Sequence, residues 1–191
     1  MTKKDVPEEK WDWVWALNPL VLVTTTDREG FVNAAPYGMC MRVCHKPLML
    51  AFSVNQKWHT RENVRETGEF VVNIPSDDSE ILKKLMITAK HFPPRVNELE
   101  EAGLTALPSK KIKPPRIGEC KAHFECRVDW MREVANHSLV VGNVVAVSID
   151  EDCITENYEL IIDKLRSVHY LGKVYKDIFI GIGAKHRVER R

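Results

Sequence analysis

The sequence predicts a mainly β protein with short helices, built as one β-barrel domain with helical decorations. A chain of 191 residues fits a single domain with a sizeable core. Its apolar segments are mostly short, β-branched runs bounded by turn residues, which is the pattern of strands. Only two or three short helical patterns interrupt them, without the regular strand–helix alternation of a parallel α/β sheet.

Composition narrows the function classes. Lys plus Arg number 28 and Asp plus Glu 27, and the net charge of +1 argues against a dedicated nucleic-acid surface. No apolar run approaches the length of a membrane span, and the N-terminus lacks the apolar core of a signal peptide. We therefore expect a cytoplasmic protein with no membrane partner.

The five cysteines are scattered, and without a secretion signal they are expected to be reduced thiols. Cys40 and Cys44, followed by His45, invite comparison with metal ligands. An extended segment would place both cysteines on one face by parity alone, and no second ligand pair stands at zinc-like spacing. We predict no metal site.

The chain divides into an N-terminal extension (1–16), a barrel domain (17–184) and a basic tail (185–191) that is expected to be frayed. Trp11, Trp13 and Trp15 alternate within the extension. This spacing suits one face of an extended segment, or a short amphipathic piece packed on the barrel rim or on a partner.

The first predicted hairpin spans residues 19–35, with a tight turn at 27–30 that ends in Gly30. Small residues then surround Asn33, namely Ala34, Ala35 and Gly38. Small side chains allow a flat ligand to approach the backbone closely. They equally relieve crowding where a barrel strand bends.

The central stretch has the pattern of a strand, a polar turn, a short helix, a glycine stop and a second strand. Its predicted elements are a strand at 48–54, a turn at 55–57, a helix at 61–67 and a strand at 70–74. His59 or Thr60 is expected to cap the helix, and Gly68 to end it in the left-handed conformation. A helix start surrounded by Lys57, His59, Thr60 and Arg61 favours an anion, although an ordinary strand–helix connection shows the same residues.

The second half begins with a helix at 80–89, capped from within 76–79 and followed by Lys90, which complements the helix dipole. Residues 91–119 form a long Pro- and Lys-rich excursion with one short helix, which we expect to cover a ligand or reach a partner subunit. The remaining predictions are strands at 122–130 and 136–149, a bend at Gly142, a mixed segment at 161–172 and a strand candidate at 177–182. His137, at a strand start, also suits an ordinary surface position.

Several of these segments resemble the flavin reductase-like, FMN-binding split-barrel family, and its flavoredoxin-type branch in particular. The resemblance spans about residues 17–175. The segments that carry it are Asn33-Ala-Ala-Pro-Tyr, Ala51-Phe-Ser-Val through Thr60-Arg-Glu-Asn63, Glu66-Thr-Gly-Glu-Phe-Val-Val-Asn-Ile74, Glu119 to Val128, His137 to Gly142 and His169 to Gly172.

The resemblance implies a Greek-key split β-barrel, usually a homodimer, with one FMN per subunit near the dimer interface. It implies that Asn33 bonds the flavin ring or ribityl chain, that Met39 lines the ring, and that Thr60 binds the phosphate. Lys90 and His137 would approach the flavin and are the candidate catalytic residues. The full set of implied cofactor-binding residues is Asn33, Ala34, Ala35, Tyr37, Gly38, Met39, Cys40, Ser53, Val54, His59, Thr60, Asn63, Lys90, His137 and Tyr170.

The function implied is an FMN-dependent oxidoreductase in which NADH, NADPH or a redox partner protein supplies electrons that pass through FMN to an acceptor. The cofactor carries the chemistry, so no side-chain nucleophile is required. The alternative is a non-catalytic FMN-binding electron-transfer protein without nicotinamide activity of its own.

Overall fold

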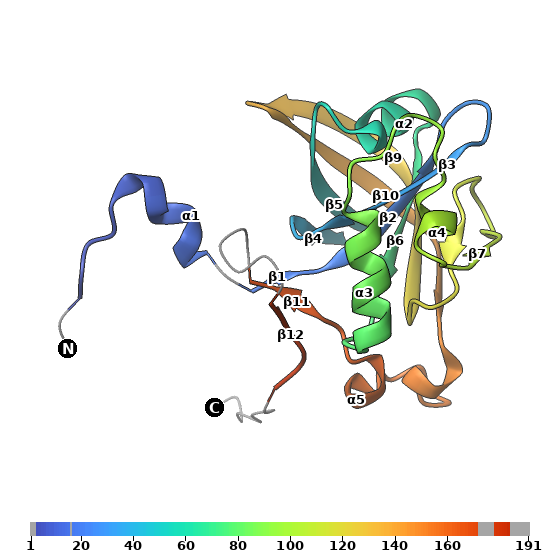
Figure 1. The fold of residues 1–191 in the computed structure, drawn as a ribbon. Helices are drawn as coiled ribbons and strands as arrows, with labels where there is room; N and C mark the ends of the chain where they lie inside the picture. The colour runs from blue at the N-terminus through green and yellow to red at the C-terminus, as the bar shows by residue number, and fades with distance from the viewer. Residues whose placement is uncertain (1–2, 16, 172–177, 184–191) are drawn as a thin grey trace.

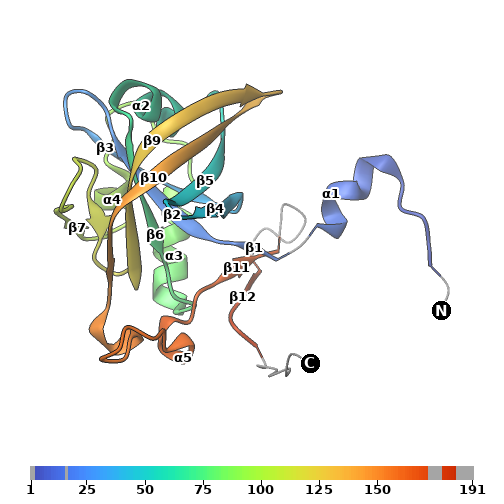
Figure 2. The ribbon, with the colours of Figure 1, turned by 180° about the vertical axis from the view of Figure 1, so that it is seen from behind.

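The computed structural model describes residues 3–15, 17–171 and 178–183 of the chain, which form a curled antiparallel sheet with short helices around it (Figures 1 and 2). The predicted basic tail lies outside these residues. The elements are η1 Glu8–Lys10, α1 Trp11–Val14, β1 Asn18–Pro19, β2 Val21–Thr26, β3 Val32–Tyr37, β4 Cys40–His45, β5 Leu48–Asn55, α2 His59–Thr67, β6 Glu69–Ile74, α3 Ser79–Thr88, α4 Glu98–Glu101, β7 Ala106–Leu107, β8 Arg116–Ile117, β9 Ala122–Val134, β10 His137–Ile149, η2 Glu151–Cys153, α5 Ile162–Leu165, β11 His169–Tyr170 and β12 Phe179–Ile180.

The main sheet has seven strands in the order β3-β2-β6-β9-β10-β5-β4. Its two edge strands, β3 and β4, follow each other in the chain and are joined only by Gly38 and Met39. Because two residues cannot span an open seven-stranded sheet, the sheet must curl until its edges meet. The mainly β, split-barrel fold expected from the sequence is therefore confirmed.

Two apolar cores lie on the two faces of this sheet. Val21 and Val23 of β2 point into the barrel, whereas Leu22 and the preceding Leu20 pack in the outer core beside α3 and α4. This explains why every residue of β2 is buried. Inside the barrel, the Phe52 ring makes edge-to-face contacts with Tyr37 and Phe70, each at a centroid distance of 5.1 Å.

A turn, two helix ends and a bend that were predicted from residues adjacent in the chain are confirmed. The first hairpin pairs β2 with β3 around a turn in which Gly30 has φ 93°, and α2 ends at Gly68 with φ 68°. Asp78 caps α3 by accepting bonds from the backbone N–H groups of Glu80 and Ile81. The strand starting at His137 has one of its two register shifts at Gly142, as predicted, and the other between Val144 and Ala146.

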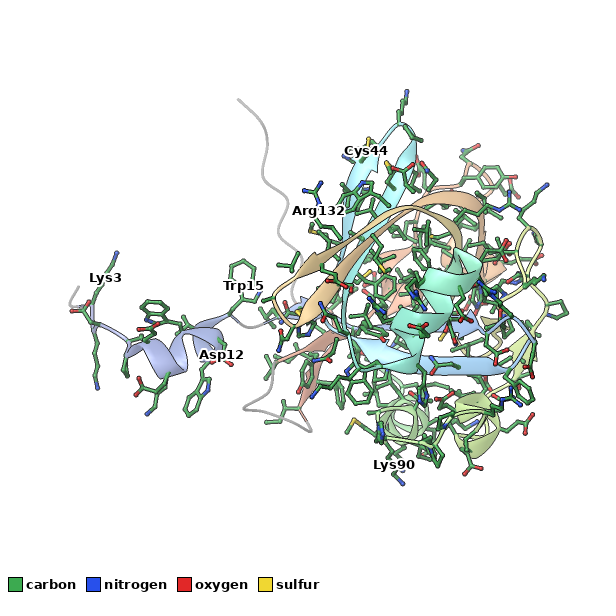
Figure 3. All side chains as sticks on the ribbon, turned by 90° about the horizontal axis from the view of Figure 1, so that it is seen from above. Lys3, Asp12, Trp15, Cys44, Lys90 and Arg132 are labelled. Carbon is green, nitrogen blue, oxygen red and sulfur yellow. The ribbon has the colours of Figure 1, made fainter. Side chains whose placement is uncertain are left out.

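The N-terminal prediction is wrong in part. Trp11 begins the short helix α1 and Trp15 follows it, so the segment is not extended. The three tryptophan side chains are exposed, although Trp15 lines a hollow beside β4. Packing of this short piece on a partner stays a prediction. Figure 3 shows Trp15 and the helix standing outside the barrel. None of the helices in the described part of the chain has the length and apolarity that a membrane crossing requires.

Buried polar side chains fasten the long excursion to the barrel. Asn73 Oδ1 accepts a hydrogen bond from the Ile117 backbone N–H at 3.0 Å. The fully buried carboxylate of Glu125 accepts bonds from the N–H groups of Lys110 and Lys111, at 2.8 and 2.7 Å. Since unpaired buried polar groups are costly, these bonds fix the excursion on its own chain.

A substitution at Gly142 tests the packing of the barrel interior. A Cβ added there would lie 2.7 Å from Cε1 and Cζ of Phe70, whose ring is fully buried. We expect Gly142→Ala to lower the free energy of unfolding by about 1–3 kcal/mol, through overpacking. The measurement is urea denaturation. The control is Gly183→Ala, where an added Cβ meets nothing within 4 Å, and an equal loss in both variants would contradict this packing.

Candidate functional site

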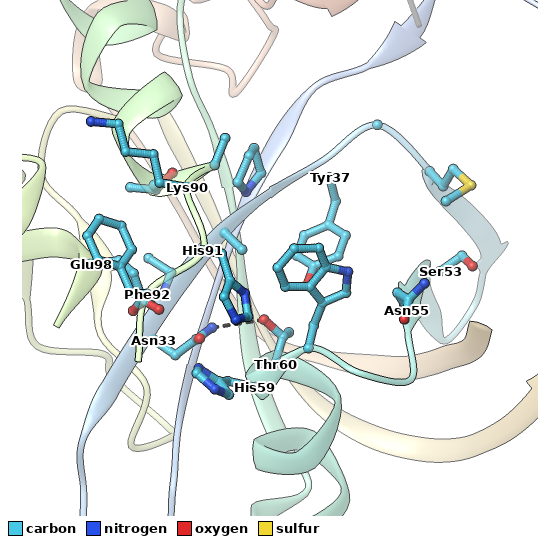
Figure 4. A pocket seen from close by; sticks show the side chains of 18 of the residues that line it. Asn33, Tyr37, Ser53, Asn55, His59, Thr60, Lys90, His91, Phe92 and Glu98 are labelled. Atoms are coloured by element: carbon cyan, nitrogen blue, oxygen red, sulfur yellow. Dashed lines mark hydrogen bonds between the residues drawn. The ribbon is translucent and has the colours of Figure 1, made fainter. Parts of the chain in front are cut away.

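A pocket of about 310 Å³ opens where β3 and β5 face each other without pairing, beside the start of α2 (Figure 4). This is the split of the barrel. The pocket is lined by Asn33, Ala34, Ala35, Pro36, Tyr37, Gly38, Met39, Ser53, Asn55, Trp58, His59, Thr60, Thr88, Ala89, Lys90, His91, Phe92, Glu98 and His137. Most of the sequence-predicted cofactor residues are thus brought together in one cavity.

The start of α2 differs from its prediction. The N-cap residue is Trp58, in an extended conformation, and both His59 and Thr60 lie inside the helix. Neither His59 nor Thr60 therefore caps it. Instead, their backbone N–H groups belong to the first turn, which has no acceptor within the helix, and both residues line the pocket. N–H groups without an acceptor favour an anion, and the positive end of the helix dipole favours it further.

The Thr60 hydroxyl is engaged within the protein. The side chain is 1% exposed, and its Oγ1 lies 2.8 Å from the side-chain amide of Asn33, a contact drawn as a dashed line in Figure 4. The Tyr37 phenol lies close to the same hydroxyl, which opposes the rise in the Tyr37 pKa. Burial raises the pKa of Tyr37 well above its ordinary value, so the phenol stays protonated. The Thr60 hydroxyl therefore has partners within the protein and is not the group that an anion would use.

Glu98 reaches the pocket from α4, in the middle of the long excursion, and is buried. One of its carboxylate oxygens, Oε2, accepts a hydrogen bond from the Ala34 backbone N–H at 3.1 Å. With the amide nitrogen of Asn33 turned toward it, Oε1 accepts a second bond, also at 3.1 Å. Burial raises the pKa of the Glu98 carboxyl, and the Ala34 N–H opposes that rise.

Aromatic rings frame the mouth of the pocket. The Trp58 and His91 rings meet edge to face at a centroid distance of 5.5 Å, and the His59 ring lies 6.2 Å from that of His91. Lys90, exposed just after α3, and His137, at the start of β10, border the same cavity. Cationic or hydrogen-bonding side chains thus stand at its rim.

Four predicted site residues lie outside this cavity. Val54 is fully buried in the barrel core, and Cys40 lines a neighbouring apolar hollow. Asn63 donates a hydrogen bond to Thr25 Oγ1 at 3.1 Å and lines an adjacent hollow that shares Asn33, His59 and Glu98 with the pocket. Tyr170 packs behind Gly38, where an added Cβ would lie 3.5 Å from its Cδ1. Their contacts with a cofactor stay predictions.

Sequence reasoning missed several lining residues. Trp58, His91 and Phe92 border predicted elements, and their aromatic character was an available signal. Glu98 offered none, because it lies in an acidic stretch that is typical of a solvated helix. The other missed residues are Pro36, Asn55, Thr88 and Ala89.

Chemically, the pocket combines two features. Ala35 and Met39 give the pocket apolar lining, and the small Ala34, whose side chain is buried in the outer core, lets a flat ring approach the backbone of β3. The free N–H groups at the start of α2 form a cradle for an anionic group at the same cavity. Among the described residues, no cluster of three or more His, Cys, Asp or Glu side chains is suited to a metal ion.

Known proteins are similar to this chain in sequence and in fold. Residues 17–171 match the flavin reductase like domain. A protein of Aquifex aeolicus is 35% identical over 162 residues, which cover 82% of each chain. Nitrilotriacetate monooxygenase component B from Bacillus cereus superposes with a TM-score of 0.86 at 23% identity, over 98% of both chains. The flavoredoxin of Desulfovibrio vulgaris superposes with a TM-score of 0.84 at 22% identity, over 98% of this chain and 97% of the other. The chain therefore belongs to the flavin reductase-like family.

Proposed function

We propose that the protein binds FMN in the split of the barrel and is an oxidoreductase that passes electrons from NADH, NADPH or a redox partner protein to an acceptor. The observation that carries this proposal is the pairing of a helix N-terminus with an apolar slot in one cavity. FMN, when bound, supplies the transfer of hydride or single electrons, which no amino-acid side chain provides.

The start of α2 suits the phosphate of FMN. The backbone N–H groups of His59 and Thr60 lie in the first turn beside the cavity, and the helix dipole favours the negative charge. His91 stands at the rim as a further donor. The phosphate therefore anchors the cofactor through backbone groups that a change of side chain leaves in place.

The opposite wall suits the isoalloxazine ring. Ala34, Ala35 and Met39 are small or flexible enough for a flat ring to lie against the backbone. Lys90 or His137 would then hold positive charge or a proton donor near the edge of the ring. Such a group stabilises the negative charge that reduction places on a flavin.

The phosphate assignment predicts a preference for FMN over riboflavin, which differs only by lacking the phosphate. We expect the purified protein to bind one FMN per chain, and to bind riboflavin at least about tenfold more weakly, since charge-assisted bonds to the phosphate are lost. Quenching of flavin fluorescence measures both affinities. Equal affinities for the two flavins would remove the phosphate site, and no uptake of either would remove the proposed cofactor.

The reductase activity is tested separately. We expect NADH or NADPH to bleach the visible absorbance of the FMN-loaded protein under anaerobic conditions, as hydride leaves the nicotinamide for the bound flavin. Stopped-flow absorbance with each nucleotide checks this. FMN uptake without bleaching by either nucleotide would contradict the reductase and leave the electron-transfer protein.

A second copy of the chain is the proposed partner. β4 exposes Met41 and Val43, with Met39 just before it, and both methionines border an apolar hollow of about 410 Å³. The exposed Trp15 and Leu17 line the same hollow. A continuous apolar surface of this kind is typical of a protein interface. It adjoins the cofactor pocket, since Gly38, Met39 and Ser53 line both, so a dimer would shield that pocket.

We expect the protein to be a dimer and Met41→Glu to shift it toward the monomer, because a buried unpaired charge opposes association. Light scattering coupled to size-exclusion chromatography measures the masses. Tyr158→Glu, at a side chain that is 85% exposed, serves as the control. A monomeric wild type, or a Met41→Glu variant that stays dimeric, would contradict this interface.

A further inference from the structure

Four buried polar side chains form a continuous row along the floor of the pocket. Tyr37 lies beside Thr60, Thr60 Oγ1 lies 2.8 Å from the Asn33 amide, and that amide lies 3.1 Å from Glu98. The row joins β3, α2 and α4, which are far apart in the sequence. Each of the four residues is at most 9% exposed, so the row is closed off from water over most of its length.

The donors and acceptors in this row have one consistent direction, and Glu98 sets it. In its carboxylate form Glu98 only accepts hydrogen bonds. Its Oε2 takes the Ala34 N–H, so its Oε1 requires the nitrogen of the Asn33 amide. The oxygen of that amide must then face Thr60 and accept a bond from its hydroxyl at 2.8 Å. Reversing the amide would place two acceptors against each other.

We propose that Glu98 is a positioning residue of the cofactor pocket, which fixes the Asn33 amide so that its nitrogen, not its oxygen, lies on the side of α4. Asn33 lines the pocket, and its orientation decides where a ligand meets an N–H donor and where it meets a carbonyl acceptor. The ligand group recognised is therefore a hydrogen-bond acceptor, such as a carbonyl or hydroxyl oxygen of the cofactor. This inference rests on the proposed FMN site.

Glu98 also explains why the excursion is needed for the site. α4 has four residues, and its buried Leu99 packs in the outer core together with Ala34 of β3. This packing holds Glu98 against Ala34 and Asn33. The excursion thus contributes a fixed hydrogen-bonding group to the pocket floor, in addition to the rim residues that precede it.

The proposal predicts how substitutions at Glu98 and Asn33 change the melting temperature of the protein without bound flavin. Glu98→Gln keeps the shape but replaces one of two acceptor oxygens by an N–H, which then faces a donor of Asn33 or Ala34, so we expect the melting temperature to fall. Asn33→Asp opposes two carboxylates and is expected to lower it further. The double variant exchanges the two groups. The amide of residue 98 can then donate to the carboxylate of residue 33, and the hydrogen bond between the two positions is restored. We therefore expect the double variant to melt higher than Asn33→Asp alone.

Flavin binding supplies the second readout. We expect Glu98→Gln to weaken FMN binding by about tenfold, the usual effect of losing one charge-assisted contact. Glu101→Gln, exposed on the same short helix, is the matched control and should bind FMN as the wild type does. Glu98→Gln that raises the melting temperature, or binds FMN as tightly as the wild type, would overturn the positioning role. A wild type that takes up no FMN would overturn the proposed function instead, while the melting temperatures would still test the orientation of Asn33.

Discussion

The two-residue connection between β3 and β4 is the constraint on which the rest of the structure depends. Gly38 and Met39 join strands from opposite edges of a seven-stranded sheet, so the sheet has to close on itself. Closure is incomplete, because β3 and β5 meet without a ladder between them. A backbone bond from Ser53 N–H to Met39 O, at 2.9 Å, extends the β4–β5 ladder up to the connection itself. The pocket is the space that remains, and its apolar wall and polar rim come from the elements that border the split.

Buried polar groups, more than apolar contacts, complete this site. Glu98 bonds the β3 backbone, while Asn73 and Glu125 receive the backbone of the excursion farther along. Each bond satisfies a group that would otherwise be costly to bury. The excursion is consequently part of the pocket's rigid frame. A cofactor that enters the split meets donors and acceptors whose directions are already set, which lowers the entropy lost on binding.

The sequence predicted the parts of the molecule that depend on neighbours in the chain. β-branched runs and the turn at Gly30 identified the first hairpin, and Gly68 identified the end of α2, because both are local backbone requirements. The role of the Thr60 hydroxyl was not predictable in this way. Its partner, Asn33, is 27 residues distant and comes close only after the barrel closes. Glu98 was missed because its sequence neighbours Glu100 and Glu101 have the same character, and only the folded chain shows that Glu98 is the buried glutamate of α4.

The most direct test of this account is a crystal structure of the protein grown with excess FMN. We predict the phosphate at the backbone N–H groups of His59 and Thr60, with the ring against Ala34 and Ala35 and the Asn33 nitrogen facing Glu98. A split that stays empty, or an FMN bound elsewhere on the barrel, would contradict the account.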